Sequence, residues 1–108
     1  MMDIKLTSGI EIDVEAIRFN IKRIINQVYK LLPMREEGRD WIKPLETLIE
    51  ELSGMKRLIY GQDDLFFLIL CKMEGLFSLN RKEDMDIYRR IIFECLGLLN
   101  SLEKNVCN

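Results

Sequence analysis

Apolar residues recur every three or four positions through residues 17–32, 45–59 and 85–106, and this spacing places them along one face of an α-helix. A further stretch, residues 65–79, is also expected to be helical but is apolar all round at its start. Each of the four stretches is long enough for three turns or more. Helices of this length joined by short connections pack as antiparallel neighbours, so the pattern predicts a four-helix antiparallel bundle.

Proline, glycine and aspartate mark the expected ends of these helices. Pro33 is expected to end the first helix, because the residue before a proline is pushed out of the α region. Asp40 is a candidate N-cap for the second helix, in which Pro44 is tolerated because it falls in the first turn. Gly61 is a natural stop for that helix.

The N-terminal segment has a different period. Residues 4–14 alternate between apolar and polar side chains on either side of Thr7-Ser8-Gly9, which is typical of a β-hairpin. Two short strands alone are marginal in water, so this segment is expected to lean on the helices or to pair with another chain. The sequence therefore predicts a mainly α single domain, residues 1–108, with a short N-terminal β-hairpin or extended segment.

The third stretch is apolar on every side in its first two turns, because residues 65–71 contain no charged or amide side chain. A helix of this kind is either the central core helix or part of an interface. Large exposed apolar patches are rare on monomers, and six methionines add adaptable contact surface. We therefore expect a homo-oligomer or a protein partner. The contact residues that we predict are Trp41, Met55, Phe66 and Phe67.

The absence of histidine limits the chemistry that this chain can perform. Histidine is the commonest general base and the commonest nitrogen ligand for metals. Cys71 and Cys95 consequently lack a histidine that would activate them as nucleophiles, and both fall on apolar stretches where core packing is expected. The isolated glycines form no phosphate-binding loop. We expect a protein that is not an enzyme and holds no cofactor.

Charge and cysteine content restrict the partners and the compartment. With 16 Lys+Arg against 18 Asp+Glu, the net charge of -2 provides no field that attracts nucleic acid. Basic pairs such as Lys22-Arg23 and Arg89-Arg90 leave a local nucleic-acid-binding face as an alternative. The longest apolar run, residues 65–71, is far shorter than the roughly 20 residues of a membrane span. Three cysteines and no signal-peptide pattern indicate a cytoplasmic protein.

Two acidic clusters support a rival, enzymatic hypothesis. Carboxylates three or four positions apart share a helix face, as ligands of a hard cation require. The clusters resemble the Mg²⁺-binding motifs of MazG-like nucleotide pyrophosphohydrolases, although the first reads E-x-x-x-E-E and the second falls at a helix start. That resemblance implies a divalent-metal site. The ligands would be Glu46, Glu50, Glu51, Glu83 and Asp86.

Residues 32–55, LPMREEGRDWIKPLETLIEELSGM, resemble segments of small orphan proteins that bacteriophages and mobile elements encode. The resemblance implies a protein that binds a host or phage protein, such as an inhibitor of bacterial defence. The expected order of a hairpin followed by helices is also similar to phage tail-assembly chaperones, which gives a further alternative. Our leading hypothesis is a non-catalytic protein–protein interaction protein that acts as an oligomer.

Overall fold

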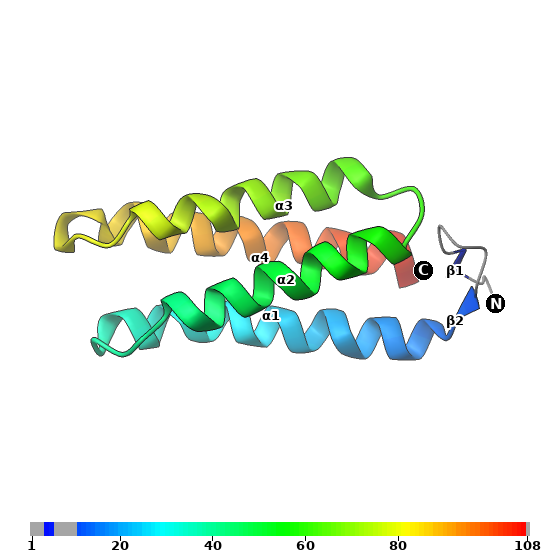
Figure 1. Ribbon diagram of the computed structural model, residues 1–108, viewed down its shortest axis with the longest axis horizontal. Helices are drawn as coiled ribbons and strands as arrows, with labels where there is room; N and C mark the ends of the chain where they lie inside the picture. The colour runs from blue at the N-terminus through cyan, green and yellow to red at the C-terminus, as the bar shows by residue number, and fades with distance from the viewer. Residues whose placement is uncertain (1–3, 6–10, 108) are drawn as a thin grey trace.

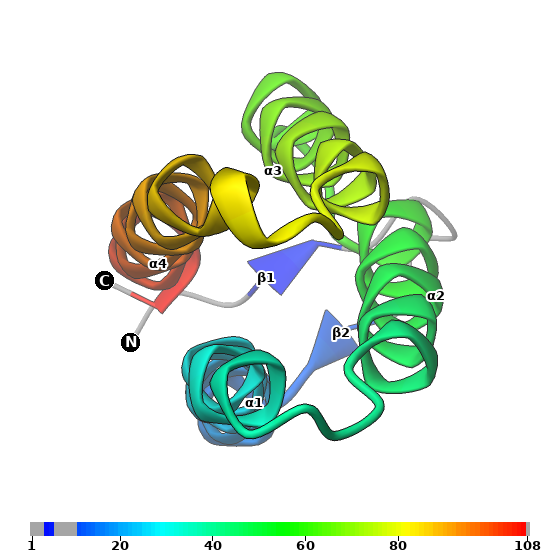
Figure 2. The same ribbon diagram turned by 90° about the vertical axis from the view of Figure 1, so that its left-hand side faces the viewer.

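The computed structural model describes residues 4–5 and 11–107, and its helices form an elongated bundle of 46 × 20 × 20 Å (Figure 1). Successive helices run antiparallel, and the end-on view shows them around one centre in chain order (Figure 2). The mainly α class and the four-helix antiparallel bundle are therefore confirmed. The helices are α1 (Val14–Glu36), α2 (Ile42–Leu58), α3 (Asp63–Gly75) and α4 (Met85–Cys107), with 3₁₀ turns η1 (Leu76–Ser78) and η2 (Lys82–Asp84) between the last two.

The N-terminal segment contributes two short strands, β1 (Ile4–Lys5) and β2 (Glu11–Ile12). They pair antiparallel, with Ile4 opposite Ile12 and Lys5 opposite Glu11. The alternation in the sequence predicts this pairing. The expected turn at residues 7–9 lies outside the described residues.

One apolar core holds the four helices together; α1, α2 and α4 contribute their predicted stripes to it, and α3 contributes Phe66, Ile69 and Met73. Full burial of one valine, leucine, isoleucine, phenylalanine or methionine side chain stabilises a fold by about 1.5–3 kcal/mol. The apolar core therefore dominates the stability of the bundle. Among the helices formed by residues 14–107, none combines the length and the hydropathy that a membrane-spanning helix needs. The fully buried side chains include Ile21, Ile24, Leu31, Leu45, Leu52, Phe66, Ile69, Met73, Leu76, Tyr88 and Ile92.

Helix α1 continues three residues past Pro33, so the predicted end at this proline was wrong. A proline inside a helix removes one backbone hydrogen bond and costs about 3 kcal/mol. Here the preceding Leu32 is buried in the core, and the last turn closes through a hydrogen bond from the Glu37 N–H to the Pro33 carbonyl, at 2.9 Å. Tertiary contacts of Arg35 anchor the same turn and offset the missing bond.

Helix α2 begins one residue later than a cap at Asp40 predicts, because Trp41 occupies the N-cap position, but Asp40 still binds the first turn. Asp40 Oδ1 accepts hydrogen bonds from the backbone N–H groups of Ile42, at 3.0 Å, and Lys43, at 3.4 Å. Pro44 lies in the first turn, where its missing N–H has no helical partner to lose. The chain turns after α2 at Gly61, whose φ of +89° is a conformation that glycine adopts without strain.

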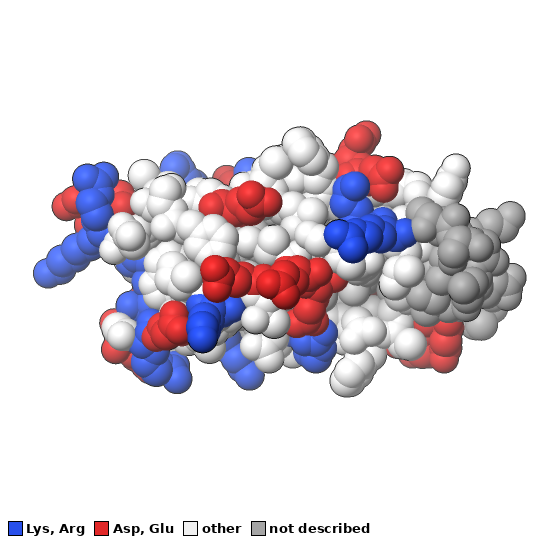
Figure 3. All heavy atoms as spheres, in the orientation of Figure 1, with Lys and Arg blue, Asp and Glu red and all other residues white. Residues whose placement is uncertain are grey.

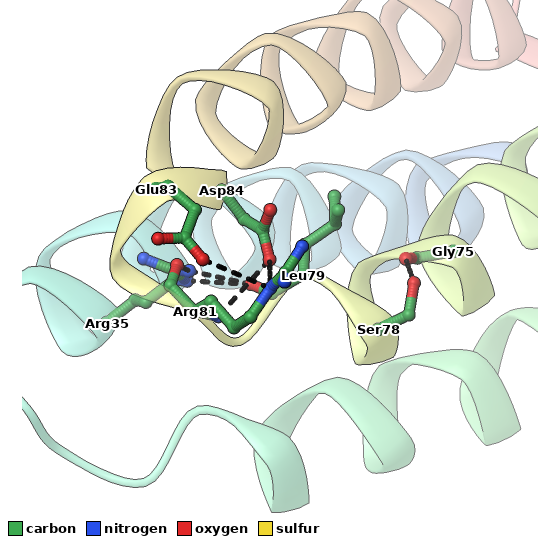
Figure 4. A network of polar contacts seen from close by, with 7 residues as sticks. All are labelled: Arg35, Gly75, Ser78, Leu79, Arg81, Glu83 and Asp84. Carbon is green, nitrogen blue, oxygen red and sulfur yellow. Dashed lines mark hydrogen bonds and ion pairs between the residues drawn. The ribbon is translucent and has the colours of Figure 1, made fainter.

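Arg35 joins the end of α1 to the connection between α3 and α4 (Figure 4). Its guanidinium donates hydrogen bonds to the Leu79 carbonyl, at 2.7 Å, and to the Arg81 carbonyl, at 2.8 Å. The same group lies 4.7 Å from the centre of the Tyr88 ring, and that ring meets Trp41 edge-on with 5.1 Å between centroids. These contacts close one end of the bundle.

Candidate interaction surface

The apolar run in α3 divides between the core and the surface. Phe66, Ile69 and Met73 are buried, whereas Phe67 is 65% exposed and Leu68 is 44% exposed. Consecutive residues of an α-helix point about 100° apart, so one apolar run places neighbours on different sides. The sequence left open whether this helix belongs to the core or to an interface. One side of the helix belongs to the core, and its exposed side is available for an interface.

The four predicted contact residues do not share a surface. Phe66 is fully buried and Trp41 is packed against Tyr88, so neither reaches a partner while the bundle is folded. Met55 is half-buried in a groove between α1 and α2. Phe67 alone of the four is largely exposed, and it is the contact residue that we retain.

The acidic residues of the rival metal-site hypothesis lie in separate places. Glu51 pairs with Arg23 across α1 and α2, and this contact raises the pKa of the Arg23 guanidinium. Glu83 Oε1 lies 3.4 Å from Arg81 Nε, and Asp86 Oδ1 lies 3.3 Å from Arg89 Nη1. The two remaining predicted ligands, Glu46 and Glu50, lie on α2. Within residues 13–106, no three acidic or cysteine side chains are placed to hold a metal ion.

Glu46 and Glu50 instead line a surface groove between α2 and α3. The other lining residues are Ile49 of α2, Glu74 of α3 and Phe77 of η1. Ile49 and Phe77 are partly buried against the core and provide an apolar floor, while the three carboxylates stand at the rim. Figure 3 shows acidic atoms gathered over α2 and α3 in the middle of this face of the molecule.

Phe67 belongs to the same side of α3 as this groove. Phe67, Cys71 and Glu74 stand at positions i, i+4 and i+7, which align along one face of a helix, and all three are exposed. We call the surface formed by Glu46, Ile49, Glu50, Phe67, Glu74 and Phe77 the α2–α3 face.

The two cysteines that the sequence assigned to the core differ in their surroundings. Cys95 is buried, and burial raises the pKa of its thiol to about 12 despite the opposing charge of Lys72. Cys71 is exposed, so its predicted place in the core was wrong. The reason is the helical phase of α3, because a run that is apolar all round gives no indication of which side faces inward.

The three glutamates of the α2–α3 face differ from the other glutamates among residues 13–106 in lacking a basic partner. Along residues 13–106, the side chains of Glu46, Glu50 and Glu74 form no ion pair or side-chain hydrogen bond. Three glutamates without a basic partner therefore line one groove. The glutamates that do pair with arginine or lysine are Glu15, Glu36, Glu37, Glu51, Glu83, Glu94 and Glu103.

Exposed aromatic residues also occur on the side formed by α1 and α4, where Tyr29 is 55% and Phe93 is 52% exposed. Ion pairs cross between these two helices, including Arg89 Nη2 to Glu36 Oε2 at 3.1 Å. Several charges on that side are thus paired within the protein, in contrast to the three glutamates of the α2–α3 face.

Glu74 and Phe77 were not among the contact residues that the sequence predicted. Both lie in the third predicted helix, but their proximity to Glu46 depends on how far antiparallel α3 slides along α2. The sequence contains one usable signal, which is the spacing of Phe67 and Glu74 on a common helix face.

No protein-family model matches this chain, and no curated protein or solved structure matches it either.

Proposed function

We propose that this protein is a non-catalytic interaction protein that binds another protein through its α2–α3 face. The observation that carries the proposal is the exposure of Phe67 on the same side of α3 as Glu74, one of the three unpaired glutamates that line the groove. Aromatic side chains are common anchors of protein interfaces because they bury a large area when a partner covers them. Phe67 has such an area available without any change in the bundle.

The separation of the acidic clusters supports this proposal over the pyrophosphohydrolase alternative. That alternative requires carboxylates from two helices to converge on one cation. Glu83 and Asp86 are instead engaged by arginines near η2, while Glu46 and Glu50 line the α2–α3 groove. No specific contact favours the tail-assembly chaperone or a nucleic-acid-binding role.

The proposal places the protein in the cytoplasm, where a reducing environment keeps an exposed thiol such as that of Cys71 free. A role as a phage accessory protein or an anti-defence inhibitor remains a prediction from the sequence resemblance alone. Homo-oligomerisation through the α2–α3 face is the competing use of the same surface, and the experiment below separates the two.

The test is site-specific photo-crosslinking in bacterial cells. A photoreactive phenylalanine analogue replaces Phe67 in one variant and Phe19 in a matched control, because Phe19 is equally exposed, at 69% against 65%, but lies on α1. We expect an adduct with a different protein at position 67 and none at position 19. Adducts of equal yield at both positions, or none at position 67, contradict the proposal. An adduct only with a second copy assigns the face to self-association.

A further inference from the structure

We infer that the partner covers the α2–α3 face with a cationic amphipathic helix, which places its apolar side on Ile49, Phe67 and Phe77 and its lysines or arginines against Glu46, Glu50 and Glu74. This inference rests on the proposed function, because it names the chemistry of the partner at the same surface.

The shape of the face suits a helix. Two antiparallel helices lying side by side leave a groove along their junction, and a third helix packs into such a groove at about 8–10 Å from each axis. Phe67 and Phe77 are ten positions apart in sequence, which corresponds to about 15 Å along α3. A docked helix of three to four turns spans that length, and it contacts the groove with residues at intervals of three and four.

The negative charge of the α2–α3 face favours a positively charged partner. Glu46, Glu50 and Glu74 have no basic partner along residues 13–106, so an apolar surface that covered them would remove three carboxylates from water without compensation. Burying an unpaired charge is strongly unfavourable, whereas a lysine or arginine at the rim restores an ion pair. Like charges across the interface are rejected for the same reason, and opposite charges also accelerate association.

A single cation is a poorer occupant of the groove than a cationic helix. The three carboxylates are not close enough together to form a metal-binding group in the described chain. They are spread along the groove instead, at spacings that match successive turns of a helix: Glu46 and Glu50 are four positions apart on α2, and Glu74 faces them from α3. The exposed Phe67 extends the apolar surface beyond the reach of an ion.

The test uses fluorescently labelled peptides of about 18 residues, or five helical turns. The first has lysines and leucines at helical spacing. The second has glutamates in place of the lysines, and the third has the first peptide's composition in an order without an apolar face. Fluorescence anisotropy measures the dissociation constant of each for the wild-type protein and two triple variants. The variants are E46Q/E50Q/E74Q, which changes the α2–α3 face, and E36Q/E83Q/D86N, which makes the same charge change at exposed residues elsewhere.

We expect the cationic amphipathic peptide to bind the wild-type protein, and the other two peptides to bind at least about tenfold more weakly. The E46Q/E50Q/E74Q variant should weaken binding by about tenfold, and E36Q/E83Q/D86N by less than about twofold. Equal losses in the two triple variants would show attraction to overall charge and overturn the inference. Equal binding of the third peptide, which lacks an apolar face, would also overturn it.

Two further outcomes separate this inference from the proposed function. If no peptide binds while position 67 still crosslinks to a protein in cells, the cationic helix is wrong and the interaction role stands. If neither occurs, both are wrong. If light scattering shows a dimer that Phe67→Ser converts to monomer, the occupant is a second copy and the inference is overturned.

Discussion

Replacing Phe66 and Phe67 by alanine, one at a time, compares two adjacent residues of the same type whose surroundings differ completely. Phe66 is 0% exposed and Phe67 is 65% exposed. Truncating a fully buried phenylalanine removes its transfer free energy and leaves a cavity, which together cost about 3–5 kcal/mol. Only about one third of Phe67 is covered, so Phe67→Ala should cost less than about 1 kcal/mol.

Urea unfolding followed by circular dichroism measures both values. A domain of this size has a urea dependence of about 1–3 kcal/mol/M, so Phe66→Ala should move the unfolding midpoint down by about 2 M and Phe67→Ala by less than about 0.5 M. If Phe66→Ala does not fold, the pair Phe66→Leu and Phe67→Leu gives a milder comparison, with the loss again confined to position 66.

A destabilisation by Phe67→Ala equal to that of Phe66→Ala would refute the reasoning. It would mean that Phe67 is covered in solution, as in an obligate oligomer, or that α3 is rotated about its axis relative to the bundle. The concentration dependence of the midpoint distinguishes these two causes, because only an oligomer becomes more stable as the protein concentration rises.

Four other predictions follow from the described contacts. Arg35→Met should destabilise the protein by about 1–3 kcal/mol in urea unfolding, because two backbone carbonyls of the α3–α4 connection lose a charged donor; an unchanged midpoint would contradict the role of this residue at the bundle end. In variants that keep one cysteine each, a thiol reagent should label Cys71 at once and Cys95 only as the protein unfolds. Burial raises the pKa of the Cys95 thiol to about 12 from an ordinary 9.0, so the folded state retains the proton longer and stability should fall as the pH rises from 9 towards 12; a Cys95→Ala variant should lose less stability over this range. Glu51→Gln should lower the free energy of unfolding by less than about 1 kcal/mol through loss of the Arg23 contact, because both groups are partly exposed, and the melting temperature should fall slightly, whereas Glu50→Gln should not lower it.

The helices and their inward stripes could be predicted because their cause is local. Ile17, Ile21, Ile24 and Val28 repeat at helical spacing with polar residues between them, and this pattern has one energetically reasonable arrangement, which is a helix with those residues in the core. The cap at Asp40 is equally local, since its carboxylate reaches N–H groups two and three residues ahead.

The end of α1 could not be predicted because its cause is distant in sequence. Pro33 opposes the helix by a local mechanism, and the sequence alone contains nothing as strong on the other side. The opposing contribution comes from Arg35, whose guanidinium reaches carbonyls 44 and 46 residues further along the chain. Where a local penalty of about 3 kcal/mol competes with tertiary contacts, the balance depends on the assembled bundle.

The candidate site was only partly accessible to prediction, because α3 has no polar face to set its helical phase. In α1 and α4 the charged residues indicate which side is outward, whereas in residues 65–71 any rotation of the helix buries a similar apolar area. Phe66 and Phe67, or Cys71 and a neighbouring leucine, are then interchangeable from the sequence. The phase is instead set by the rest of the helix, where Met73 and Leu76 are buried and Glu74 is exposed. Glu74 lies on the outward side of α3 together with Phe67, whereas Phe66 lies on the buried side. Any partner of the exposed Phe67 therefore meets a carboxylate on the same side of the helix, about two turns away along α3.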